Sequence, residues 1–212
     1  MFKKLYRDLY SYYGDLGWWP SENDDETVMG CILTQNTSWK NVEKSIKNLK
    51  ENNIKTLNDI VKLDEDNLKN LIKSSGFYNT KGKYLMNVSK SIIEKYGNIN
   101  NMKNKNRDET LKFIINLRGV GNETMESIML YALDYHVFVI DSYTFRFFKR
   151  YLNIDLKRNE LRDIIENEFK YNYELKNLHG MIVEISKDYC RKKPVCSQCF
   201  LNKNCKYNSK NP

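Results

Sequence analysis

The sequence predicts a protein built almost entirely of α-helices. Apolar residues recur every three or four positions along most of the 212-residue chain, which is the spacing that gives a helix one apolar face. Only three prolines and nine glycines interrupt this pattern. A short apolar run at 137–140 ends on Asp141. The length allows one domain or two domains that share a cleft.

In the first half of the chain, helical patterns alternate with polar or glycine-containing turns. Residues 1–13 carry an amphipathic pattern that ends at a glycine turn. Ser38 follows a polar run and can cap the next helix, because its side-chain oxygen can accept a backbone N–H. The expected helices are residues 1–13 and 26–33, one through Val42, Ile46 and Leu49, short ones at 57–61 and 66–73, and a longer one through Leu85, Val88 and Ile92 to Tyr96.

The second half continues the helical pattern around a glycine turn. Residues 97–107 are rich in Asn and Lys and are expected to form a surface loop. A helix containing Phe113 and Leu117 leads into the turn, and another helix begins near Asn122. Beyond Asp141, helices are expected near residues 143–151, 160–170 and 175–187, followed by a cysteine-rich loop.

Charge favours a polyanionic partner. The 35 Lys and Arg residues outnumber the 27 Asp and Glu residues, giving a formal net charge of +8 and a pI of about 9.1. Nucleic acid fits this balance, although a solvated lysine-rich surface produces the same excess. No window approaches the ~20 apolar residues of a membrane span, and no apolar signal core follows the first lysines. We therefore expect a soluble, cytoplasmic protein, associated with the nucleoid if prokaryotic.

Four of the five cysteines lie in the last 23 residues, in the order Cys190-x5-Cys196-x2-Cys199-x5-Cys205. Chains stabilised by disulfides usually distribute their cysteines throughout. Four closely spaced thiolates can bind one tetrahedral metal ion or an iron–sulfur cluster. The spacing predicts a metal centre and leaves zinc and iron–sulfur both open.

The other potential metal ligands have no partner at ligand spacing. Cys31 lies in an apolar helical pattern and is expected to be buried. His136 and His179 are each far in sequence from a second His or a Cys, so packing or hydrogen bonding is the expected role.

The turn Leu117-Arg118-Gly119-Val120-Gly121 is a candidate anion site. Its two glycines are expected to adopt backbone angles that other residues avoid, so that amide N–H groups point outward at the positive end of the next helix. Most such turns only connect helices, so the turn is weak evidence alone.

Five segments occur in the order of one family of DNA enzymes. They are Ile32–Thr37, Gly76–Lys81, Leu117–Gly121, Val139–Asp141 and Cys190–Cys205. Together they resemble the endonuclease III superfamily of helix-hairpin-helix DNA glycosylases over roughly residues 18–206. The resemblance implies that Gly119 and Gly121 hold the DNA backbone and that the four cysteines hold a [4Fe-4S] cluster. The family's usual first cysteine gap is six residues and this chain has five, so zinc stays an alternative.

The same resemblance implies that Asp141 is the catalytic carboxylate. Cleavage of an N-glycosidic bond builds positive charge on the sugar, which a carboxylate can stabilise while it directs a water molecule. Asp141 can also cap the helix that follows it, and both roles are compatible. Glu123 stands where bifunctional relatives carry the lysine that forms a Schiff base. We therefore expect a monofunctional enzyme that leaves an abasic site, with Glu123 beside the base or complementing a helix N-terminus.

Trp18-Trp19-Pro20 points to the type III 3-methyladenine glycosylase branch of this superfamily. The resemblance implies that these residues, with Trp39, wall the base pocket. Alkylated purines carry positive charge, which stacks well on electron-rich indoles.

The resemblance also assigns contacts with the DNA. Gln35 would fill the gap left by the flipped nucleotide, and Phe77 would wedge into the opposite strand. Lys81, Lys83 and Arg118 could contact phosphates, although each could equally be a solvated surface charge.

The sequence thus predicts a helix-hairpin-helix DNA glycosylase with two helical subdomains and a cleft between them. Residues 20–134 form a barrel ending in the hairpin, and residues 1–19 with 135–212 form the second subdomain, with Asp141 at the mouth of the cleft. We expect a monomer that removes alkylated purines from duplex DNA. Three alternatives stay open: a glycosylase for oxidised or deaminated bases, a bifunctional lyase that uses another lysine such as Lys81, and a non-catalytic lesion-binding protein.

Overall fold

The structure, a computed structural model, describes residues 1–210, which form helices joined by short segments with no strand among them. The predicted all-α class is therefore confirmed. The backbone divides into two compact units, Ser21–Tyr135 and Met1–Pro20 with His136–Pro212. Within the described chain, no helix combines the length and apolar character needed to cross a membrane.

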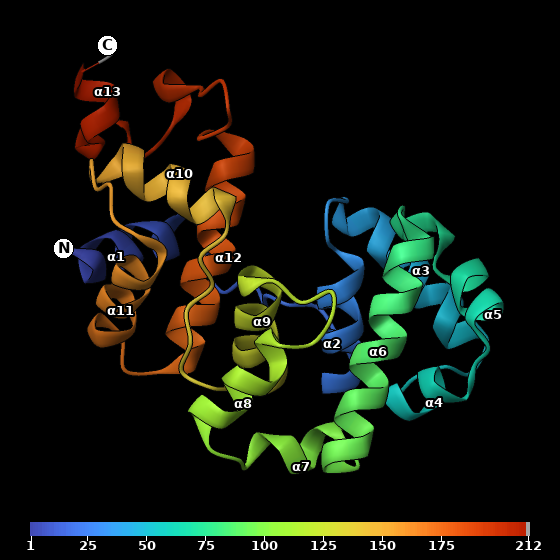
Figure 1. The fold of residues 1–212 in the computed structure, drawn as a ribbon. Helices are drawn as coiled ribbons and strands as arrows, with labels where there is room; N and C mark the ends of the chain where they lie inside the picture. The colour runs from blue at the N-terminus through green and yellow to red at the C-terminus, as the bar shows by residue number, and fades with distance from the viewer. Residues whose placement is uncertain (211–212) are drawn as a thin grey trace. The chain divides into compact units, whose positions relative to one another are not determined.

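The unit Ser21–Tyr135 is organised around the long helix α6, which lies against α2, α4 and α5 (Figure 1). Several of its helices begin at side-chain caps: Asn23 accepts the backbone N–H of Glu26, and Thr56 forms a capping box with Asp59. The helices are α2 (Asp24–Leu33), α3 (Trp39–Glu51), α4 (Leu57–Lys62), α5 (Glu65–Leu71), η1 (Lys73–Ser75), α6 (Tyr78–Tyr96), α7 (Ile99–Lys103), α8 (Arg107–Ile115), α9 (Asn122–Ser127) and the π-helical turn η2 (Ile128–Ala132).

Two local predictions in this unit are wrong. The expected surface loop at 97–107 contains the helix α7, because Asn98 accepts the backbone N–H of Asn101 and starts a helix that buries Ile99 and Met102. Ser38 occupies the N-cap position of α3, but its side chain makes no capping hydrogen bond.

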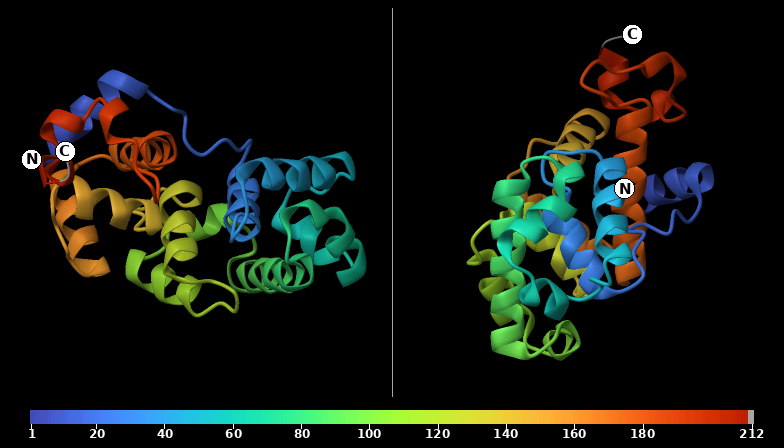
Figure 2. Two further views of the ribbon diagram at one scale, coloured as in Figure 1. Left: turned by 90° about the horizontal axis from the view of Figure 1, so that it is seen from above. Right: turned by 90° about the vertical axis from the view of Figure 1, so that its right-hand side faces the viewer.

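The second unit is built around α12, which packs against α1 and α10 (Figures 1 and 2). The N-terminal helix joins the C-terminal part through aromatic contacts: the ring of Phe2 lies 5.5 Å from that of Phe148, and Tyr12 stacks on Phe200 at 4.0 Å. The helices are α1 (Phe2–Tyr13), α10 (Ser142–Tyr151), α11 (Arg158–Glu168), α12 (Asn172–Asp188), η3 (Cys196–Gln198), η4 (Asn202–Asn204) and α13 (Lys206–Lys210).

Candidate functional site

The glycine turn between α8 and α9 has one residue that must be glycine. Gly119 has a φ of +93°, and a Cβ on it would lie 2.1 Å from the ring of Tyr84. Gly121 has an ordinary φ of −95°, so the expectation that both glycines need unusual angles is wrong for Gly121. A Cβ on Gly121 would meet nothing within 4 Å, so steric contacts inside the protein do not explain why this residue is glycine. A bare backbone at this position suits close approach by an external group.

These two glycines supply a matched pair of stability predictions. Gly119→Ala should lower the free energy of unfolding by about 2 to 4 kcal/mol, because it adds left-handed strain to a collision with the Tyr84 ring. Gly121→Ala should change the free energy of unfolding by less than about 1 kcal/mol. Urea unfolding of both variants measures the difference, and equal losses would contradict the assigned backbone geometry.

Side chains from elsewhere in the same unit hold the turn in place. The Gln35 amide donates to the Gly119 carbonyl at 2.9 Å and to the Thr124 hydroxyl at 3.1 Å. The Asn87 amide donates to the Arg118 carbonyl at 3.4 Å. The loop after α2 and the hairpin are therefore fixed to one another before any ligand arrives.

Phe77 is the most exposed large apolar side chain in the described chain, at 71%. It follows Gly76 at the tip of the turn before α6, and its φ of +46° is unusual for a residue with a side chain. Arg118 and Lys83 are also exposed, as a phosphate contact requires. Glu123 is exposed in the first turn of α9, near the positive end of that helix, and Trp39 is half-buried at the start of α3.

Lys81 differs from the other predicted DNA contacts. It is only 2% exposed, and its ammonium group donates to the carbonyls of Leu33 at 2.7 Å and Ser75 at 2.6 Å. A direct phosphate contact is therefore wrong for this residue. Attack on a sugar, considered above as a route to lyase activity, is excluded by the same burial.

Asp141 is a buried carboxylate at the N-cap of α10. Its Oδ1 accepts the Thr144 backbone N–H at 2.7 Å, so the predicted capping role is confirmed. Its Oδ2 lies 3.6 Å from Nε2 of His179. Burial alone would raise the pKa of Asp141, but the His179 imidazole and the Thr144 donors outweigh it and lower that pKa below the ordinary aspartate value. The carboxylate is therefore ionised at neutral pH although it is only 7% exposed.

Trp18 belongs to the same unit as this carboxylate and packs on α12. Its ring packs directly on Gly180, where a Cβ would come within 2.8 Å of the indole, and Gly180 follows His179 in α12. The Lys187 ammonium lies 5.1 Å from the Trp18 ring centroid. Trp19 is half-buried and Pro20 is exposed. Trp18 and Asp141 thus contact adjacent residues of α12, Gly180 and His179 respectively.

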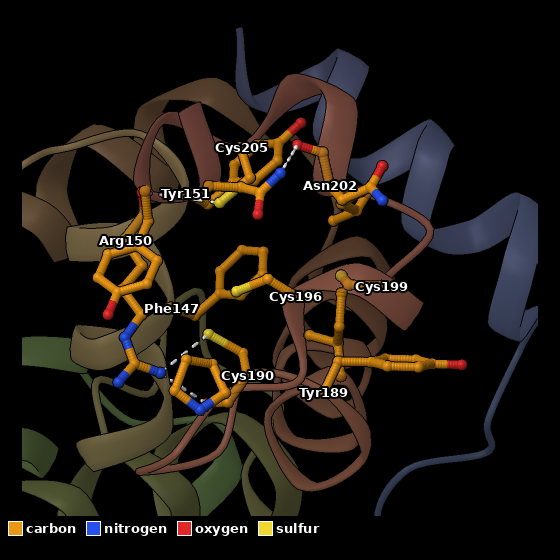
Figure 3. Close-up of a pocket in the computed structure, with 14 residues that line it drawn as sticks. Phe147, Arg150, Tyr151, Tyr189, Cys190, Cys196, Cys199, Asn202 and Cys205 are labelled. Atoms are coloured by element: carbon orange, nitrogen blue, oxygen red, sulfur yellow. Dashed lines mark hydrogen bonds between the residues drawn. The ribbon is translucent and has the colours of Figure 1, made fainter. Parts of the chain in front are cut away.

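The four C-terminal cysteines line one pocket together with apolar side chains (Figure 3). All four are free thiols. Arg150 of α10 donates to the Cys190 sulfur at 3.5 Å and to the backbone carbonyls of residues 190–192. Within residues 1–210, no three His, Cys, Asp or Glu side chains are grouped to hold a metal ion as the structure stands.

Comparison with known proteins identifies the family. Residues 29–174 match the model of the HhH-GPD superfamily base excision DNA repair protein. The chain belongs to this superfamily. It is 45% identical to the "Putative DNA repair glycosylase MJ1434" of Methanocaldococcus jannaschii, over 97% of this chain and 96% of that one.

Two solved structures resemble the chain. The H. pylori 3-methyladenine DNA glycosylase MagIII, bound to 1,N6-ethenoadenine, is 29% identical with a TM-score of 0.76, over 87% of this chain and 95% of that chain. A non-covalent endonuclease III–DNA complex has a TM-score of 0.82 at 20% identity, over 99% of this chain and 96% of that chain, and supports the fold alone. The predicted resemblance to the endonuclease III superfamily and the predicted DNA glycosylase class are confirmed.

In this DNA glycosylase, sequence reasoning missed the partners of Asp141 and Lys81. For His179 packing or hydrogen bonding was expected without a named partner, and its ring contacts the Asp141 carboxylate from 38 positions along the chain. Its place directly before Gly180, in an otherwise apolar stretch, was the only signal available in the sequence. His136 does have the predicted hydrogen-bonding role, since its ring nitrogens contact Asn172 and the Glu166 carbonyl. Cys31 is buried, as predicted.

Proposed function

We propose that this DNA glycosylase flips a damaged base out of duplex DNA and hydrolyses its N-glycosidic bond, with Asp141 as the catalytic carboxylate. The observation that carries the proposal is a buried aspartate held ionised by His179 and Thr144. Positive charge grows on the sugar as the base leaves, and a fixed anion in a site of low dielectric stabilises that charge strongly. The same carboxylate can orient the attacking water molecule.

Alkylated purines are the proposed substrates. Trp18 offers an indole that packs on Gly180, the residue after the Asp141 partner His179, and a cationic base such as 3-methyladenine stacks favourably on an indole. Such a base is already activated as a leaving group, so the site needs little acid catalysis. The similarity to MagIII, at 29% identity, supports the same substrate class. Trp19, Pro20, Trp39 and Glu123 stay predictions as further pocket residues.

The proposed DNA contacts of the hairpin, Phe77 and Gln35 all lie within the unit Ser21–Tyr135. The amides around Gly121 would hold a phosphate at the start of α9, with exposed Arg118 beside them. Phe77 would wedge between bases, and Gln35 would fill the gap that the flipped nucleotide leaves. Because Gln35 is bonded to the hairpin, its insertion would have to exchange those hydrogen bonds for contacts with DNA.

We propose hydrolysis without strand cleavage, because neither of the two positions considered for a lysine nucleophile offers an accessible amine. Glu123 replaces the family lysine, a carboxylate cannot form a Schiff base, and Lys81 is buried. We therefore propose that water is the nucleophile and that an abasic site is the product.

The four cysteines are proposed to hold a [4Fe-4S] cluster. They surround a pocket with apolar walls, which suits a group of several atoms better than a single ion, and Arg150 can donate to a ligating sulfur. A bound cluster supplies a covalent cross-link of the loop. In this chain the loop carries Arg191, Lys192 and Lys193, which are exposed and suited to the DNA backbone.

A panel of damaged duplexes tests the proposal. Release of free base should be measured side by side from duplexes that contain 3-methyladenine, uracil or an oxidised purine, with borohydride present in parallel reactions. We expect release of 3-methyladenine and no protein–DNA adduct. Release from only the oxidised or deaminated duplex would overturn the substrate class, and a borohydride-trapped adduct would overturn the monofunctional mechanism. No release from any duplex would leave only DNA binding.

A further inference from the structure

The buried ammonium group of Lys81 has no role in the chemistry proposed above. Burying a charge is costly unless strong hydrogen bonds compensate it. In the part of the chain that the structure describes, no carboxylate pairs with Lys81, and its bonds go to the carbonyls of Leu33 and Ser75 at 2.7 and 2.6 Å. Burial lowers the pKa of Lys81 to about 8, so the group is charged at neutral pH but only weakly favoured in that form.

The two carbonyls belong to the ends of two different helices. Leu33 is the last residue of α2, and Ser75 is the last residue of η1. A carbonyl at a helix end has lost its partner within the helix, and a cation beside it is favourable. Lys81 lies in the first turn of α6 and donates to both carbonyls, so one side chain hydrogen-bonds to two helix ends that are 42 residues apart in the sequence.

Each of these helix ends is followed closely by a side chain that is predicted to insert into DNA. Gln35 lies two residues beyond Leu33, and Phe77 lies two residues beyond Ser75. Phe77 has a left-handed backbone and a side chain that is 71% exposed, so its ring does not anchor the turn. Local hydrogen bonds, such as that from the Gly76 N–H to the Lys73 carbonyl, hold the turn in itself, and Lys81 adds the bond that ties it to the end of α2. Gln35 is in turn bonded to the hairpin at Gly119. A chain of hydrogen bonds therefore joins the Phe77 turn, the Gln35 loop and the hairpin.

We propose that Lys81 is a positioning residue that fixes the Gln35 and Phe77 loops relative to one another, so that both can enter DNA at one lesion. The proposal rests on the proposed function, because it assigns those loops to DNA. A protein whose inserting loops are already fixed loses less conformational entropy when it binds distorted DNA. Lys81 should therefore increase the preference for a lesion over undamaged DNA more than it increases binding to DNA in general.

The test compares Lys81→Met with Lys90→Met in the 212-residue chain. Lys90 is an exposed lysine on the same helix and has no role in the site. Two quantities are measured: amide hydrogen exchange at residues 34–38 and 75–78, and the affinity for a duplex with a tetrahydrofuran abasic-site analogue relative to the same duplex undamaged. For Lys81→Met we expect exchange at least about tenfold faster in both loops, equivalent to about 1.4 kcal/mol, and a similar loss of lesion preference. Lys90→Met should leave the lesion preference unchanged.

The outcomes separate this inference from the proposed function. Faster exchange confined to one loop, or unchanged exchange in both with lesion preference kept, overturns the role of Lys81 even when base release is normal. General loss of protection across α4 and α6 assigns Lys81 to overall stability and also overturns it. If the two loops loosen together in Lys81→Met but the wild type releases no base from any duplex, the positioning role stands and the proposed function fails.

A second measurement needs no variant, in case Lys81→Met does not fold. Hydrogen exchange of the wild type is compared at pH values below and above 8, after correction for the intrinsic pH dependence of exchange. Loss of the proton weakens both charge-assisted bonds, so both loops should lose protection together while α6 keeps its own. Unchanged protection, or loss in one loop only, contradicts the proposal.

Discussion

Asp141→Asn is expected to slow single-turnover base release by about 100- to 1,000-fold, the usual cost of losing one preorganised electrostatic group. Asparagine caps helices about as well as aspartate, so the bond to the Thr144 N–H can persist and the fold should survive. The variant removes the negative charge and little else. Rates on a 3-methyladenine duplex, with binding to an abasic-site analogue measured in parallel, test this expectation.

Asp155→Asn serves as the control for that variant, because Asp155 is an exposed carboxylate that pairs with Lys149. It should leave base release within about twofold of the wild type. A wild-type rate in Asp141→Asn would remove Asp141 from the mechanism. Loss of DNA binding together with catalysis would show that the residue acts by capping α10.

The pH dependence of the wild type should follow from the same carboxylate. The pKa of Asp141 is lowered from 3.8, so its charge, and the stability contributed by its bonds to Thr144 and His179, is fully present above that value. Both are lost only as the pH falls through the lowered pKa. Acidification from pH 7 to pH 5 should therefore not protonate Asp141, and the single-turnover rate of the wild type, measured across this range, should show no acid limb from this group.

Periodicity was sufficient to predict the helical class, because burying one face of a helix needs apolar residues at regular spacing. It failed at α7, where only Ile99 and Met102 mark a buried face within a segment rich in Asn and Lys. It also could not separate Gly119 from Gly121. The two differ only in backbone angle and in the distance to Tyr84, and that ring comes from α6, far away in the sequence.

The candidate site shows the same division between local and distant information. The capping role of Asp141 was predictable because the apolar run before it and the helix after it are local features. His179 and the carbonyl partners of Lys81 were not predictable, since each contact joins segments at least six residues apart, and most are more than 35 apart. A lysine in an amphipathic helix is usually at the surface. Only the fold shows that Lys81 faces two helix ends.

The largest stability effect is expected from Cys199→Ser. If the four cysteines hold a cluster, removal of one ligand should abolish iron binding and lower the free energy of unfolding on the order of 4 kcal/mol, which is the stabilisation that a ligand provides at 1,000 times its Kd. The loop would then depend on the Arg150 bonds and on the stacking of Tyr12 with Phe200.

Elemental analysis and urea unfolding of the purified proteins test this expectation, with Cys31→Ala as the control. Cys31 is a buried thiol remote in sequence from the cysteine loop, so its loss should cost some stability and no metal. Zinc in place of iron in the wild type would contradict the cluster and favour a single tetrahedral ion. Iron content that is equal in Cys199→Ser and the wild type would exclude Cys199 as a ligand. Because metal content is measured independently of base release, the result decides the chemistry of this loop whether or not the substrate has been identified.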